Sequence, residues 1–147
     1  MPKYAKNTIV SVAKSKAEIE RILQRYGAKQ FIAGWDQTFA YVGFIINNRA
    51  IKIPIELPLK EAYCETPTGM LRSPETAMKH WEQACRQKWR ALVLVVKAKL
   101  EAVESGIATV ENEFLAYTCL PSGETVSQWL QPQMDKVLEG DMPKLLT

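Results

Sequence analysis

One run of the chain decides the fold: residues 73–104 read SPETAMKHWEQACRQKWRALVLVVKAKLEAVE. Ser73 is a typical helix N-cap, and Pro74 suits the first helical position, where no backbone N–H is needed. Neither proline nor glycine recurs before Gly106, which we expect to end the helix. A helix of this length measures about 46 Å and must cross a compact domain of this size, either as one protruding rod or in two broken parts.

One flank of this helix is apolar. At about 100° per residue, a stripe of apolar side chains recurs on the same side, as in a helix that packs on a core. The stripe consists of Trp81, Cys85, Trp89, Leu92, Val96, Leu100 and Val103. We expect these side chains to face the core of the domain.

A second flank of the same helix is basic, about 110° from the apolar stripe. We call it the basic line, and it consists of Lys79, Arg86, Arg90 and Lys97. Residues 79–100 hold six basic residues and one acidic residue, so the line could follow a phosphate backbone or contact an acidic protein surface. A solvated helix face is the plainer alternative, because Glu82 and Glu101 stand four residues from members of the line.

A shorter helix is predicted near the N-terminus. Ser15 and Glu18 have the Ser-x-x-Glu spacing of a capping box, and Gly27 should end the helix. Its apolar face, at Ile19, Ile22, Leu23 and Tyr26, should pack on the core. Basic residues on and around it could extend a charged surface, and they are Lys14, Lys16, Arg21, Arg25 and Lys29.

Three strands are predicted between the two helices, at residues 30–35, 39–47 and 49–57. Asn47-Asn48 is a two-residue hairpin signal. Because proline cannot donate to the ladder, Pro54 indicates that the third strand lies at a sheet edge or that its proline side faces water. The middle strand is apolar on both faces, so one face must meet the core and the other must be covered or bind something.

Aromatic side chains on these strands form a second candidate site. Trp35, Phe39 and Tyr41, with Lys52 nearby, could make a platform on which single-stranded bases stack. Aromatic residues of a β-meander also commonly fill the core, and that alternative stays open here.

The remaining residues predict a loop and two short helices. Residues 58–72 have little periodicity and are expected to form a loop. Thr109 can cap a short helix that runs to Tyr117, and a Thr-x-x-Gln capping box at Thr125 opens a second one that ends at Gly140. The chain is therefore expected to be a single α+β domain. It should consist of an N-terminal helix, a three-stranded antiparallel meander, one long helix and two short C-terminal helices, with residues 107–147 as a candidate helical appendage.

The composition argues against several functional classes. The three cysteines are widely spaced and His80 is the only histidine, so neither a zinc site nor a disulfide framework is expected. No phosphate loop or nucleophile elbow occurs, so we expect a protein that is not an enzyme and needs no cofactor. The N-terminus lacks the apolar run of a signal peptide, which favours a cytoplasmic location.

Several stretches carry a resemblance to known sequences: residues 4–6 (YAK), 17–20 (AEIE), 25–28 (RYGA), 89–92 (WRAL), 97–104 (KAKLEAVE), 120–121 (LP) and 123–130 (GETVSQWL). In these the chain resembles short uncharacterised proteins encoded by phages, prophages and other mobile elements. The resemblance implies an origin but assigns no site residues.

Two functions follow as expectations. The first is an accessory protein of a phage or mobile element that binds nucleic acid, through the basic line and through Trp35 and Tyr41. The alternative is a protein that binds and modulates a host enzyme or defence complex. Its contact surface would then be exposed aromatic side chains, the 58–72 loop or the acidic C-terminal segment, and self-association along the long helix is a further expectation.

Overall fold

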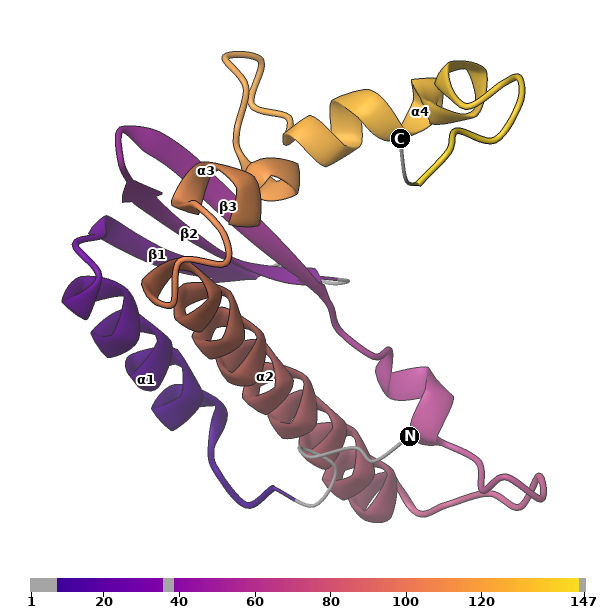
Figure 1. The fold of residues 1–147 in the computed structure, drawn as a ribbon. Coiled ribbons are helices and arrows are strands. Elements are labelled where there is room, and N and C mark those ends of the chain that lie inside the picture. The colour runs from indigo at the N-terminus through magenta and orange to yellow at the C-terminus, as the bar shows by residue number, and fades with distance from the viewer. Residues whose placement is uncertain (1–7, 36–38, 146–147) are drawn as a thin grey trace.

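The computed structural model describes residues 8–35 and 39–145, and these form two layers (Figure 1). One layer is an antiparallel sheet in the order β1 (Lys29–Trp35), β2 (Phe39–Ile46) and β3 (Arg49–Glu56). The other layer holds α1 (Val12–Arg25) and α2 (Pro74–Glu104), which cover one face of the sheet. The predicted α+β class is confirmed.

The long helix α2 is unbroken over 31 residues. Ser73 Oγ accepts a hydrogen bond from the Thr76 backbone N–H, which confirms the predicted N-cap. Most of the predicted apolar stripe is buried: Cys85, Trp89, Leu92, Val96 and Leu100. Trp89, Leu92, Val96 and Leu100 belong to the core cluster with the buried residues of the sheet, together with Val93.

The start of α1 was predicted wrongly. The N-cap is Ser11, whose side chain accepts a hydrogen bond from the Lys14 backbone N–H, so the helix begins before the expected capping box. Ser15 lies inside the helix and is fully buried. Glu18 does not reach back to an N-cap either, because its carboxylate contacts α2.

Helices α1 and α2 run side by side in the same direction (Figure 1). Three contacts along their length show this, each between residues 72 to 78 positions apart in the chain. Gln83 Nε2 donates to the Thr8 carbonyl at 2.8 Å, Arg90 pairs with Glu18, and the Tyr26 hydroxyl donates to Glu104 at 2.5 Å. The flank of α2 beside its core stripe is therefore occupied by α1.

The tight turn between β2 and β3 forms at its predicted place. Asn47 and Asn48 have φ angles of 50° and 60°, as the two central residues of a tight hairpin turn require. The Pro54 prediction is confirmed, since β3 is an outer strand of the order β1-β2-β3. Beyond β3, Thr118 forms a short bridge with Ile51 and the Cys119 N–H donates to the Ala50 carbonyl at 2.8 Å.

The segment expected to be a plain loop, residues 58–72, is folded. It contains the 3₁₀ helix η1 (Lys60–Tyr63) and a small hairpin closed by the Glu65–Leu71 bridge. The Arg72 N–H donates to the Cys64 carbonyl at 2.8 Å and fixes the base of the hairpin.

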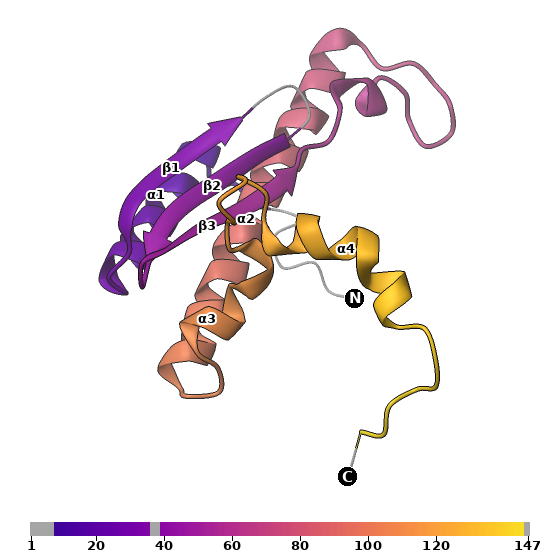
Figure 2. The same cartoon turned by 90° about the horizontal axis from the view of Figure 1, so that it is seen from above.

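The C-terminal segment divides into an attached part and a projecting part. After α3 (Val110–Glu113), Phe114 is fully buried against Phe44 in an edge-to-face contact, and η2 (Leu115–Tyr117) follows. Helix α4 (Val126–Val137) extends away from the two layers (Figures 1 and 2). No helix of the described residues is long and apolar enough to span a bilayer.

Candidate functional site

The basic line lies along the flank of α2 that faces α1. Two of its members share one carboxylate: Arg90 Nη1 lies 2.5 Å from Glu18 Oε2, and Lys97 Nζ lies 2.8 Å from Glu18 Oε1. Hydrogen bonds from Arg90 and then from Lys97 lower the pKa of Glu18 from 4.5 to about 2. These two cations are therefore occupied by a contact between the helices.

The other two members of the basic line also have local partners. Arg86 donates from Nε and Nη2 to Gln83 Oε1 at 3.0 and 2.6 Å, and Lys79 Nζ lies 3.9 Å from Glu75 in a solvent-exposed pair. The line thus does not form the row of free cations that the sequence suggested. For Arg90 and Lys97 the physical reason is that α1 packs on the side of α2 next to its core stripe, whereas Lys79 and Arg86 have their partners on α2 itself.

The predicted aromatic platform is split between the two faces of the sheet. Trp35 pairs with Ala40 across the β1–β2 ladder, whereas Tyr41 pairs with Gly34. Neighbours along a strand point to opposite faces, so Trp35 lies on the side of the buried Ala40 and Tyr41 on the other side. The expected platform of Trp35 with Tyr41 is therefore wrong. The side chain of Phe39, the third predicted member of the platform, lies outside the described part of the structure.

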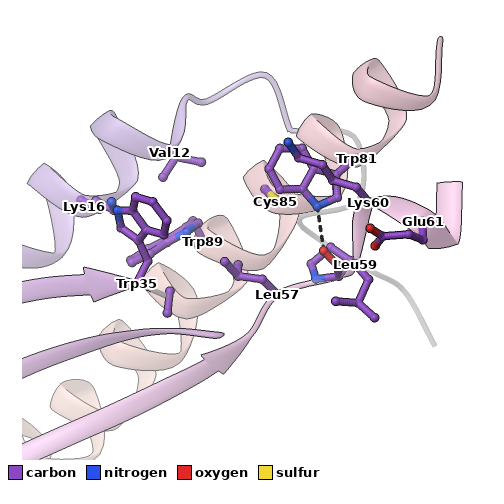
Figure 3. A pocket seen from close by; sticks show the side chains of 12 residues that line it. Val12, Lys16, Trp35, Leu57, Leu59, Lys60, Glu61, Trp81, Cys85 and Trp89 are labelled. Carbon is purple, nitrogen blue, oxygen red and sulfur yellow. Dashed lines mark hydrogen bonds between the residues drawn. The ribbon is translucent and has the colours of Figure 1, made fainter. Parts of the chain in front are cut away.

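Trp35 instead lines a cleft between the layers. It has a volume of about 680 Å³ and lies between the start of α1, the middle of α2, the end of β3 and η1. Three of the four tryptophans of the chain line it, namely Trp35, Trp81 and Trp89. We call it the tryptophan cleft, and Figure 3 shows Trp35 and Trp89 toward one end and Trp81 toward the other.

A lysine stands at each end of the tryptophan cleft (Figure 3). Lys16 Nζ lies 4.8 Å from the centre of the Trp89 ring, and Lys60 Nζ lies 4.7 Å from that of Trp81. Within the described part of the chain, neither lysine takes part in an ion pair. Glu61 is the only acid among the described lining residues, so the cleft is apolar in its walls and cationic at its ends.

Other contacts fix the walls of the cleft. The Trp81 Nε1–H donates to the Pro58 carbonyl at 2.7 Å, which ties η1 to α2 and holds the indole in place. Trp89 is buried beneath Lys16, while Trp35 is 74% exposed and presents its ring to solvent. An incoming planar ligand therefore has one open indole to stack on, with two ammonium groups within the same cleft.

Cys85 is the cysteine that lines the cleft. Burial raises the pKa of the Cys85 thiol, which keeps it in the weakly nucleophilic protonated form. No group of three metal-ligating side chains occurs among residues 8–35 and 39–145. What the cleft offers is an aromatic surface and positive charge, which together suit a ligand with a flat ring and an anionic group.

The sequence did not show that these residues line one cleft. Trp81 and Trp89 were assigned to the core stripe, Trp35 to another site and Lys60 to a loop. The available signal was the gathering of tryptophans on one helix together with Lys16 on α1, but only the packing of α1 beside α2 brings these residues together.

Comparison with known proteins adds no second source of information. No family model, no curated protein and no solved structure matches this chain. Its function is therefore inferred from the residues of the cleft.

Proposed function

We propose that this protein binds single-stranded nucleic acid in the tryptophan cleft, as a non-enzymatic accessory protein of a phage or mobile element. One observation carries the proposal: Lys16 and Lys60 stand over two indoles of the same cleft, beside the exposed Trp35. Proteins that bind single strands without reading their sequence combine these two features, aromatic rings for the bases and cations for the phosphates.

Single-stranded nucleic acid fits the cleft better than a duplex does. The Trp35 ring is exposed, while Trp81 and Trp89 lie deeper in the cleft between the two layers, which an unpaired base can enter and a stacked base pair cannot. The basic line is a secondary element of this proposal. Arg86 and Arg90 each follow a residue of the cleft wall in the chain, Cys85 and Trp89.

Binding of a labelled single-stranded oligonucleotide, measured by fluorescence anisotropy over a range of salt concentrations, tests this proposal. Replacing Trp35 with alanine should weaken binding by about 1–3 kcal/mol, the usual contribution of one stacked base. The double variant Lys16→Gln with Lys60→Gln should reduce the slope of log affinity against log salt by about 1.4, because two phosphate contacts are lost.

A matched control lies on the opposite face of the sheet. Lys52 Nζ stands 4.7 Å from the centre of the Tyr41 ring, the same kind of pair as in the cleft. The Lys52→Gln variant should leave both the affinity and the salt slope unchanged. Equal losses in Lys52→Gln and in the cleft variants, or no binding by the unaltered protein, would contradict the proposal.

A second candidate function is binding of a host or phage protein through the hairpin of residues 65–71. Met70 and Leu71 are largely exposed on this hairpin although its backbone is fixed by hydrogen bonds. Such exposed apolar side chains on an ordered segment are typical of protein contacts. Capture of partners from a nuclease-treated lysate by the native chain, but not by Met70→Ser with Leu71→Ser, would support this alternative.

A further inference from the structure

Helix α4 has an apolar side that the described residues cover only in part, because Val126, Leu130 and Met134 are half-buried and the others are exposed. Its apolar residues recur at helical spacing, and they are Val126, Trp129, Leu130, Met134, Val137 and Leu138. None of the residues of α4 is buried, and Trp129, Val137 and Leu138 are 51%, 65% and 68% exposed. An amphipathic helix gains little stability without a surface under its apolar side.

The sheet has a second uncovered apolar surface, the face opposite α1 and α2. We call it the outer sheet face. Its described apolar residues are Ile32, Gly34, Tyr41, Gly43, Ile45, Ala50 and Pro54, and its charged residues are Lys29, Lys52 and Glu56. In Figures 1 and 2 no described helix lies over it, although the turn before α4 overlaps the β3 side, and Ile32 is 57% exposed. A solvated face of an antiparallel sheet is usually polar, so this face has the composition of a contact surface.

The root of α4 is fixed at the edge of this outer sheet face. The Val126 N–H donates to the Thr118 carbonyl, and Thr118 pairs with Ile51 of β3. The Thr125 side chain is buried and forms a capping box with Gln128. These contacts set the direction of α4, which runs from the β3 edge away from its own sheet (Figures 1 and 2). The helix therefore cannot cover the outer sheet face of its own chain without breaking its root.

We propose that two copies of this chain form a reciprocal dimer, in which α4 of each copy lies on the outer sheet face of the other. Figures 1 and 2 place α4 on the outer side of the sheet, just beyond β3. A two-fold axis near that edge places α4 of each copy over the sheet of the other copy. The assembly then contains two copies and does not grow further. In this dimer the apolar side of α4 and the outer sheet face of one copy are both covered by the other copy.

The charges of the two surfaces fit this arrangement. The outer sheet face carries Lys29 and Lys52 against Glu56, so its net charge is positive. Helix α4 and the residues after it carry Asp135, Glu139 and Asp141 against Lys136 and Lys144, so their net charge is negative. The tryptophan cleft lies on the α1 and α2 side of the sheet and stays open in the dimer. The dimer is therefore independent of the proposed nucleic-acid binding, and neither requires the other.

Sedimentation equilibrium of the full chain over a wide range of concentration tests the dimer. The unaltered chain should have twice the mass of one chain. Val137→Asp on α4 and Ile32→Asp on the outer sheet face should each give the mass of a monomer, with unchanged circular dichroism because both side chains are largely exposed. Gln131→Asp adds the same charge to α4 about 120° round the helix from Val137 and should leave the dimer intact.

An equimolar mixture of the Val137→Asp and Ile32→Asp chains sharpens the test. One copy then supplies an intact α4 and the other an intact outer sheet face, so one of the two contacts can form. The mixture should regain dimer that neither chain forms alone. A monomeric unaltered chain, or a dimer that survives Ile32→Asp, would overturn the proposal, and the latter result would place α4 on another surface.

Discussion

Glu18 on α1 and Arg90 on α2 form a hydrogen-bonded ion pair, with Oε2 2.5 Å from Nη1, although they are 72 residues apart in the chain. Their side chains are 23% and 19% exposed, and Lys97 binds the other oxygen of the same carboxylate. The pair joins two parallel helices on one face of the sheet. Cations that resembled a ligand-binding surface in the sequence thus help to hold the fold.

Replacing Glu18 with glutamine should make stability less dependent on pH. The pKa of Glu18 falls from 4.5 to about 2 on folding, so its charge stabilises the fold above about pH 4.5, and this stabilisation is lost as the pH falls toward 2. Allowing for solvent screening of a partly exposed pair, we expect Glu18→Gln to cost about 1 kcal/mol at neutral pH. Urea denaturation of both proteins should show this gap closing in acid, and a constant gap would refute the assignment.

Gly34 should not tolerate a side chain. A Cβ built at this position would lie 2.5 Å from Cε1 of the Tyr41 ring, which covers Gly34 from the neighbouring strand. We expect Gly34→Ala to reduce the free energy of unfolding by about 1–3 kcal/mol through overpacking. The double variant with Tyr41→Ala should lose less than the sum of the single losses in urea denaturation. Additive losses would mean that the two residues do not meet.

Ser15 should be replaceable by alanine with a gain in stability. Its hydroxyl is buried and has no hydrogen-bond partner within the described residues. Leaving a polar group unpaired in the interior costs about 1–3 kcal/mol, and alanine removes that group while keeping a good helix former. Thermal unfolding of Ser15→Ala should therefore occur at a higher temperature. A lower melting temperature would show that the hydroxyl is satisfied in solution.

Phe114 should be needed for the whole fold and not only for the C-terminal segment. It is fully buried, and its ring centre lies 5.6 Å from that of Phe44 in β2. We expect Phe114→Ala to cost about 3–5 kcal/mol, as for large aromatic residues in a core. Leu115→Ala, at the exposed neighbouring position, is the control and should change stability little in the same urea titration.

Much of the fold could be predicted because its signals are local. Ser73, Pro74 and Gly106 bound α2 as expected, and the Asn47-Asn48 turn sets the pairing of β2 with β3. The start of α1 was missed because Ser11 and Ser15 are both acceptable N-caps. What distinguishes them is a tertiary contact, since Glu18 is engaged by α2.

The site was harder to predict because its residues are distant in the chain. Trp35 and Trp89 line one cleft although they lie in β1 and α2, and Lys60 comes from a segment expected to be a loop. The basic line was recognised correctly as one flank of α2. The ion pairs of Arg90 and Lys97 with Glu18 were not predicted, because the sequence pattern does not reveal which flank of α2 a neighbouring helix occupies.

The indole N–H signals in a ¹H–¹⁵N NMR spectrum test the central claim most directly. The chain has four tryptophans, three in the tryptophan cleft and Trp129 on α4, and single Trp→Phe variants assign their signals. Titration with a single-stranded oligonucleotide should shift the signals of Trp35, Trp81 and Trp89 and leave that of Trp129 in place. Shifts confined to Trp129, or an unchanged spectrum at saturating oligonucleotide, would contradict binding in the cleft.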